Sequence, residues 1–290
     1  MRKEYPLLVL AAFIWGSGHP VIKLILRELH PIQISMASAA LSFLVLALAV
    51  PFTKPRNRNF RWEKMPWMVT AGAVIFFIYP ILSFSALQRI PASVNGILVA
   101  TSTIFVALIA ASALGEALSA TNYLGIVAAF IGVALIIQGS TGVFSASIQG
   151  VKISGFILSL SGALASAIYT IIGRKLKEED PLNVTLVAAG SGAVLQAVTT
   201  GIFTGFHAFL MASLQAWLLL LYWGLLSGLA YLIYYFSLKR MEAARASSFI
   251  YLSPIFAAIT STIILGEKLT ILFLAGMILV LIGIRLTQKG

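Results

Sequence analysis

Two ionisable side chains and a tryptophan lie near the start of the chain at intervals of four residues. Trp15, His19 and Lys23 fall within an apolar run, so a helix places them on one face, one turn apart. Counted from Tyr5, Trp15 lies about 15 Å along that helix, near the middle of a bilayer core. An imidazole titrates near neutral pH, and an ammonium group attracts carboxylates. His19 is therefore a candidate proton or ligand site, and Lys23 a candidate for attracting an anionic substrate.

Each of these three side chains also has a structural interpretation. Trp15 could pack between helices, and His19 could be a neutral imidazole hydrogen-bonded to a neighbouring helix. Lys23 could extend its ammonium group to the water beyond the end of the helix.

Other polar side chains share helix faces deeper in the chain and complete the candidate substrate site. Hydroxyl, phenol and amide groups can bind a small ligand, although each alone is more often an interhelical contact. With Trp15, His19 and Lys23, the predicted substrate-binding residues are Tyr79, Ser83, Asn95, Ser102, Tyr169, Tyr231, Tyr234, Ser248 and Tyr251.

The carboxylates lie at or beyond the ends of the apolar runs. They are Glu4, Glu28, Glu63, Glu116, Glu178, Glu179, Asp180, Glu242 and Glu267. No acid is predicted at mid-membrane depth, which weighs against a cation exchanger with an intramembrane Glu and against a channel with an acidic ring. Clustered carboxylates or histidines for catalysis are lacking, and Ser17 and His19 point about 200° apart on a helix. We expect no enzyme, no metal site and no cofactor.

These side chains must be positioned by helices inside a membrane. The 290 residues are 60% hydrophobic and 10% charged, with a mean hydropathy of +0.99, which excludes a soluble domain. Continuous apolar runs favour helices over barrel strands, which alternate. The predicted spans are 6–27, 32–52, 66–87, 92–114, 119–138, 153–173, 182–203, 214–237, 243–265 and 269–286.

The charges predict the orientation of these ten spans. If the N-terminus is cytoplasmic, 15 of the 20 Lys and Arg residues fall on the cytoplasmic side. Loops rich in Lys and Arg stay inside, so we expect both termini in the cytoplasm of a multi-pass cell-membrane protein. The net charge of +11 then indicates topology, and suits contact with anionic lipid, rather than nucleic-acid binding.

The two halves of the chain resemble each other at a nearly constant offset. A shift of 151 pairs Leu114–Glu116 with Leu265–Glu267 without a gap, and a shift of 150 pairs Pro31 with Pro181. We predict an all-α protein of two five-helix repeats, 1–140 and 150–290, joined by a linker at 141–149. Because five is odd, the second repeat enters from the opposite face. Inverted repeats are a transporter architecture that can alternate between two openings.

The sequence also resembles the EamA-type permeases of the drug/metabolite transporter superfamily. WGSGHPVIK (15–23) is similar to the first-helix signature, and SALQRIPASVNGILVATSTIFVALIAASALGEAL (85–118) to the segment of helices three and four. AYLIYYFSLKRMEAARASSFIYLSPIFAAITSTIILGEKL (230–269) repeats the latter pattern. The resemblance implies a ten-helix permease or exporter of small metabolites such as amino acids, with a cavity lined mainly by helices 1, 3, 4, 6, 8 and 9.

The leading hypothesis is alternating-access transport of a small organic molecule by a monomer or homodimer in a lipid bilayer. A membrane scaffold or receptor of the same fold, without transport, is the alternative.

Overall fold

The computed structural model describes residues 4–52, 61–114, 119–141, 152–176, 178–238 and 252–287. All regular elements in these ranges are helical, which confirms the predicted all-α class. They are α1 (Glu4–Ile25), α2 (Pro31–Ala49), η1 (Val50–Phe52), η2 (Trp62–Lys64), α3 (Met65–Gly72), η3 (Ala73–Ile78), α4 (Tyr79–Leu87), α5 (Ala92–Ala100), α6 (Ser102–Leu114), α7 (Ala120–Thr141), α8 (Ile153–Lys175), α9 (Pro181–Phe203), α10 (His207–Met211), α11 (Leu214–Leu238), α13 (Leu252–Leu265) and α14 (Ile271–Thr287).

Seven described helical segments are long and apolar enough to cross a membrane, and three shorter apolar helices accompany them. Each of the predicted spans overlaps one of these segments. Large apolar side chains such as Leu124, Val194 and Ile202 expose 65%, 65% and 71% of their area, as expected for helices that face lipid. The chain is a multi-pass membrane protein, and the predicted linker 141–149 lies almost entirely outside the described residues.

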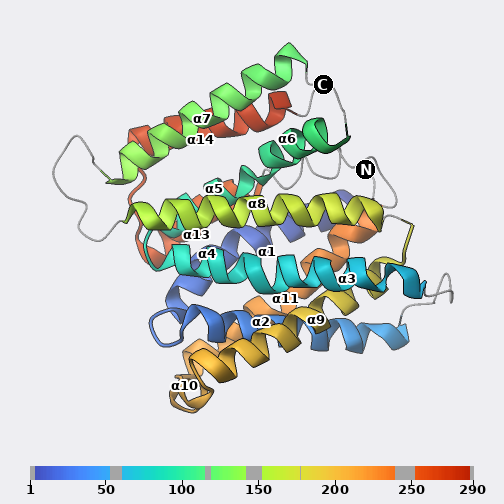
Figure 1. The fold of residues 1–290 in the computed structure, drawn as a ribbon. Helices are drawn as coiled ribbons and strands as arrows, with labels where there is room; N and C mark the ends of the chain where they lie inside the picture. Colours follow the sequence, from blue (N-terminus) through green and yellow to red (C-terminus); the bar gives the residue numbers. More distant parts are fainter. Residues whose placement is uncertain are drawn as a thin grey trace.

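The helices run back and forth along a common direction (Figure 1). α1 and α2 are joined by only five residues, so α2 returns toward the end at which α1 begins. α1 packs against α11 and α13, and α2 against α9 and α11, so elements of the two sequence halves interleave. The buried apolar side chains form clusters between these helices, one of them around α2, α3, α8, α9 and α11.

The third predicted span is interrupted by a π-helix, η3, followed by Pro80. Proline has no N–H, so the carbonyl of Phe76 loses its ordinary helical donor. Gln196 of α9 is fully buried and supplies the replacement, because its Nε2 donates to the oxygens of Phe76 at 3.2 Å and Phe77 at 3.1 Å. A proline inside an apolar run indicates a kink, but the π-helix and its partner on α9 are visible only in the structure.

The fourth predicted span is two helices rather than one. α5 ends at Ala100, and Thr101 occupies a turn in which both its N–H (3.1 Å) and its hydroxyl (2.6 Å) donate to the carbonyl of Leu98. The hydroxyl competes for a carbonyl that a continuing helix uses, which favours a break. Ser102 begins α6, whose main neighbour is α8.

α7 and α14 form a close pair at the edge of the bundle (Figure 1). A Cβ on Gly132 would lie 2.7 Å from the Gly276 carbonyl, and one on Gly276 would lie 2.6 Å from the Gly132 carbonyl. Only glycine allows backbones to approach this closely, a common device of membrane helices. These two glycines therefore serve the packing of α7 against α14.

Candidate functional site

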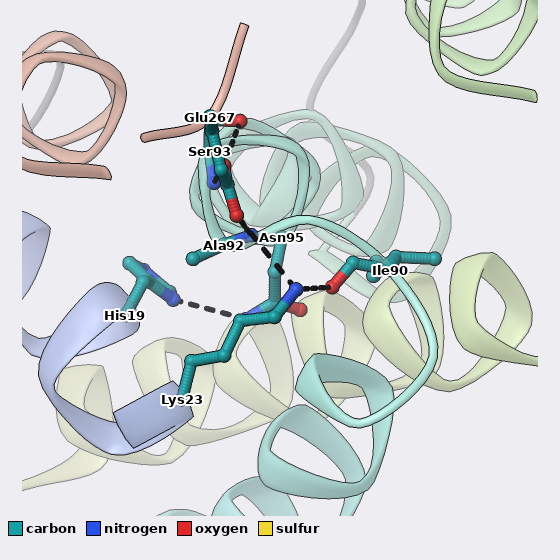
Figure 2. A network of polar contacts seen from close by, with 7 residues as sticks. All are labelled: His19, Lys23, Ile90, Ala92, Ser93, Asn95 and Glu267. Atoms are coloured by element: carbon teal, nitrogen blue, oxygen red, sulfur yellow. Dashed lines mark hydrogen bonds and ion pairs between the residues drawn. The ribbon is translucent and has the colours of Figure 1, made fainter. Parts of the chain in front are cut away.

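Three polar side chains from three helices meet inside the bundle. The amide nitrogen of Asn95, on α5, lies 2.9 Å from Nδ1 of His19, on α1 (Figure 2). It also donates to Oγ of Ser83, on α4, at 3.0 Å. The side chains are 0%, 7% and 1% exposed. Proximity of the three was not predicted, although each was singled out separately.

One hydrogen-bond acceptor of this cluster has no donor. Oδ1 of Asn95 is buried without a hydrogen-bond partner, and so is Nε1 of Trp15, one turn before His19 on α1. Buried polar atoms are nearly always hydrogen-bonded, and leaving one unpaired costs about 1–3 kcal/mol. The unpaired oxygen of Asn95 indicates a place in the cluster where a ligand or water completes the site, and Trp15, one turn away on α1, has an unpaired donor as well.

A second polar group lies one turn away, at the beginning of α5 (Figure 2). The carboxylate of Glu267 accepts from the N–H of Ala92 (2.7 Å), the N–H of Ser93 (3.1 Å) and the hydroxyl of Ser93 (2.7 Å). Lys23 donates to the carbonyl of Ile90 at 2.7 Å, and its Nζ is 3.7 Å from the same carboxylate. The Lys23 ammonium group therefore has two protein partners near the start of α5, while 32% of its side chain is exposed.

The residues that precede Glu267 aim its carboxylate. α13 ends at Leu265, and Gly266 has a φ of +66°, the left-handed conformation that ends many helices. The N–H of Gly266 donates to Thr262, and that of Glu267 to Ser261 at 3.4 Å, so the chain turns sharply. The Leu-Gly-Glu motif thus has a physical meaning here: glycine makes the turn, and glutamate reaches the N-terminus of another helix.

Aromatic side chains extend the site along α1 and α11. The ring of Trp15 lies 5.4 Å from that of Tyr231 and 5.8 Å from that of Tyr234, and Tyr231 contacts Phe76 (5.3 Å) and Tyr169 (6.2 Å). Rings at such distances attract each other beyond their buried area. Four of the five were predicted as binding residues, and the structure brings these four together.

A small cavity of about 30 Å³ lies between α2, the η3–α4 segment and α11. Its lining includes six residues that carry hydroxyl groups, namely Ser35, Ser38, Ser42, Tyr79, Ser227 and Tyr231. Trp223 lines it too, and packs directly on Gly18, the residue before His19. The volume suits about one water, so a metabolite enters only if side chains or helices move.

The remaining predicted residues fall elsewhere. Ser102 is on α6, away from α1 and its polar cluster, and Ser248 and Tyr251 lie outside the described residues. Sequence reasoning missed Ser93 and Glu267 as partners, and also the serines of α2 that line the cavity. Helical spacing within α2 would have signalled Ser35, Ser38 and Ser42, which share one face.

Polar links also join the ends of the bundle. At the end where α1 begins, Arg61 donates from Nε (2.7 Å) and Nη2 (2.6 Å) to Oε1 of Glu179. At the opposite end, Glu28 accepts from the N–H and the hydroxyl of Ser213, both at 2.7 Å. These hydrogen bonds hold the pKa of the Glu28 carboxyl below its usual value. Within the ranges that the structure describes, no group of three His, Asp or Glu residues could hold a metal ion.

Comparison with known proteins agrees with this description. A sequence model described as the EamA-like transporter family matches residues 2–138 and again residues 153–288. A protein of Archaeoglobus fulgidus named an uncharacterized transporter is 27% identical, covering 99% of each chain. A probable amino-acid metabolite efflux pump of Escherichia coli is 25% identical over 100% of this chain and 96% of its own.

Two further proteins complete the comparison. A probable terminal-alkyne amino-acid exporter of Streptantibioticus cattleyicolor is 25% identical over 97% of this chain and 92% of its own. A solved crystal structure superposes with a TM-score of 0.68 over 99% of this chain and 96% of the other, at 17% identity, and shows the shared fold.

Proposed function

The chain belongs to the EamA-like transporter family, and we propose that it carries small organic metabolites, first of all amino acids or related amphiphiles, across the cell membrane by alternating access. The proposed architecture is ten membrane-crossing helices in two inverted repeats, with both termini in the cytoplasm. Amino-acid derivatives are the first candidates because two relatives are named as exporters of such compounds.

One observation carries the assignment of the site: buried polar atoms without partners lie beside a cluster from three helices. Asn95 Oδ1 is an unpaired acceptor and Trp15 Nε1 an unpaired donor. A ligand with both donor and acceptor groups satisfies them, and the rings of Tyr231 and Tyr234 provide an apolar wall. Such a site suits an amphiphilic molecule better than a simple inorganic ion.

The cavity supports passage rather than permanent binding. A volume of about 30 Å³ is far below the usual 300–1,000 Å³ of a site for an organic ligand. Asn95 and Trp15 do not line this cavity, and their unpaired atoms are buried, so the described conformation is closed to a metabolite and ligand access requires a rearrangement. A carrier that alternates between two openings passes through such a closed state.

The experiment is a thermal-shift screen of the purified protein against a metabolite panel, followed by uptake of each hit into proteoliposomes. We expect at least one amino acid or amphiphile to raise the melting temperature and to be taken up. The Asn95→Ala variant should show neither the rise in melting temperature nor the uptake. A folded protein that binds nothing and transports nothing across a broad panel would contradict the proposal and favour a scaffold.

A further inference from the structure

We propose that Glu267 is a positioning residue that latches one end of the bundle shut, and that this latch must release for the proposed transport to occur. The inference rests on the proposed function, since a latch has a purpose only in a protein that opens. Its basis is a carboxylate from one half of the chain held by three hydrogen-bond donors and one ammonium group from the other half (Figure 2).

The latch crosses the boundary between the two predicted repeats. Ala92, Ser93 and Lys23 precede the linker, whereas Glu267 follows it. Helix packing also crosses this boundary, since α13 lies against α1 and α5. In an alternating-access carrier, helices that meet around the site move apart at one end at a time, so contacts that join them at that end must break.

The latch differs from an ordinary surface ion pair in burial and directionality. The Glu267 side chain is 14% exposed and the Lys23 side chain 32%. Charge-assisted hydrogen bonds to backbone amides at a helix N-terminus are among the stronger polar contacts, because the helix dipole favours a negative group there. The N–H groups of Ala92 and Ser93 lose the Glu267 carboxylate as their acceptor when the α13–α14 turn moves away. The contact is therefore either formed or broken, with the end of the bundle closed or open.

The latch is coupled to the binding cluster through α5. Asn95 lies in the first turn of α5, which begins at the residues that Glu267 holds. Gly96 is packed so closely that a Cβ there would lie 2.5 Å from Ala257 of α13 and 3.3 Å from the His19 ring. Any tilt of α5 when Glu267 releases therefore moves Asn95 relative to His19 and Ser83.

The opposite end of the bundle offers a matched control. Arg61, from the first half, and Glu179, from the second, form the corresponding link between halves there. Substitution of Arg61 should loosen that end and leave the Glu267 end closed.

Pulsed spin-label distance measurements in detergent or nanodiscs test the latch. The chain contains no cysteine, so Gln88→Cys and Ile271→Cys place one label beside the start of α5 and one beside the α13–α14 turn, both at exposed positions. In this labelled parent we expect mainly one short distance. Glu267→Gln should raise the population with a long distance, relative to the population with the short one, by about tenfold. This is the expected effect of losing a hydrogen bond to a charged group. Glu267→Asp should fall between the two.

Ser93→Ala provides a second variant in case Glu267→Gln fails to fold, and should lengthen the distance in the same direction to a smaller extent. Distances unchanged in both variants, or lengthened equally by Arg61→Gln, would overturn the latch. The labels report without any substrate, so this result is independent of transport. A folded parent without flux would instead contradict the proposed function.

Discussion

At the scale of single residues, the site is built around Asn95. Its amide connects His19 on α1 with Ser83 on α4, and its oxygen is left available. The sequence predicts these residues one by one, because polar groups within apolar spans are expensive and usually functional or paired. It could not predict which of them meet, since that depends on how α1, α4 and α5 pack. The hydrogen bond of His19 to a neighbouring helix agrees with the structural interpretation, and a role in proton binding stays a prediction.

Replacing Asn95 with alanine should reduce flux more than it reduces stability. The change removes two hydrogen bonds and leaves His19 and Ser83 without this partner, at a cost of about 1–3 kcal/mol for each buried group left unpaired. We expect uptake into proteoliposomes to fall at least about tenfold. Asn183→Ala is the control, because Asn183 lies in the first turn of α9, where its backbone N–H donates to Asp180. Equal uptake by the two variants would remove Asn95 from the site.

At the scale of elements, the third predicted span has an internal structure that its hydropathy does not indicate. Pro80 signals a disturbed helix, but nothing local to the sequence indicates that the disturbance becomes a π-helix or that Gln196 donates to its carbonyls. The signal lies 116 residues away from Pro80, a separation across which sequence patterns give no pairing. The π-helix adds a residue to the turn and so sets which faces Tyr79 and Ser83 present to the site.

A double-mutant cycle tests whether Pro80 and Gln196 are energetically coupled. Gln196→Leu leaves the carbonyls of Phe76 and Phe77 without their donor, which should lower stability by about 1 kcal/mol in a membrane helix. In a Pro80→Ala background the new N–H can bond Phe76, so the same leucine should cost less. Gln215→Leu, at an exposed position, is the control. Additive effects in thermal unfolding would show that the two residues do not cooperate.

The link between Glu28 and Ser213 predicts a dependence of stability on pH. Hydrogen bonds from Ser213 lower the pKa of Glu28 below its usual 4.5, so the folded state favours the charged form. The contribution is then complete above pH 4.5 and is lost as the pH falls through the lowered pKa. We expect Glu28→Gln to melt below the parent at neutral pH and the difference to vanish in acid. The difference should also shrink in a Ser213→Ala background; a pH-independent difference would contradict the link.

At the scale of the whole molecule, composition and apolar runs predicted the all-helical, multi-pass character of the chain. Length and hydropathy are physical requirements of a bilayer, so helices and their approximate ends follow from them. The break at Thr101 and the short α10 were not predicted, since a local turn hardly changes hydropathy. The interleaving of α1 with α11 and α13 depends on packing between halves, which no single span encodes.

The most direct test of the transport proposal is counterflow in proteoliposomes. Vesicles are loaded with unlabelled substrate from the thermal-shift screen and diluted into a trace of labelled substrate. A carrier that alternates between two openings exchanges one molecule for the other, so labelled substrate should transiently accumulate above its outside concentration. A slow rise to equal concentrations without overshoot, or no uptake by folded protein, would contradict the account.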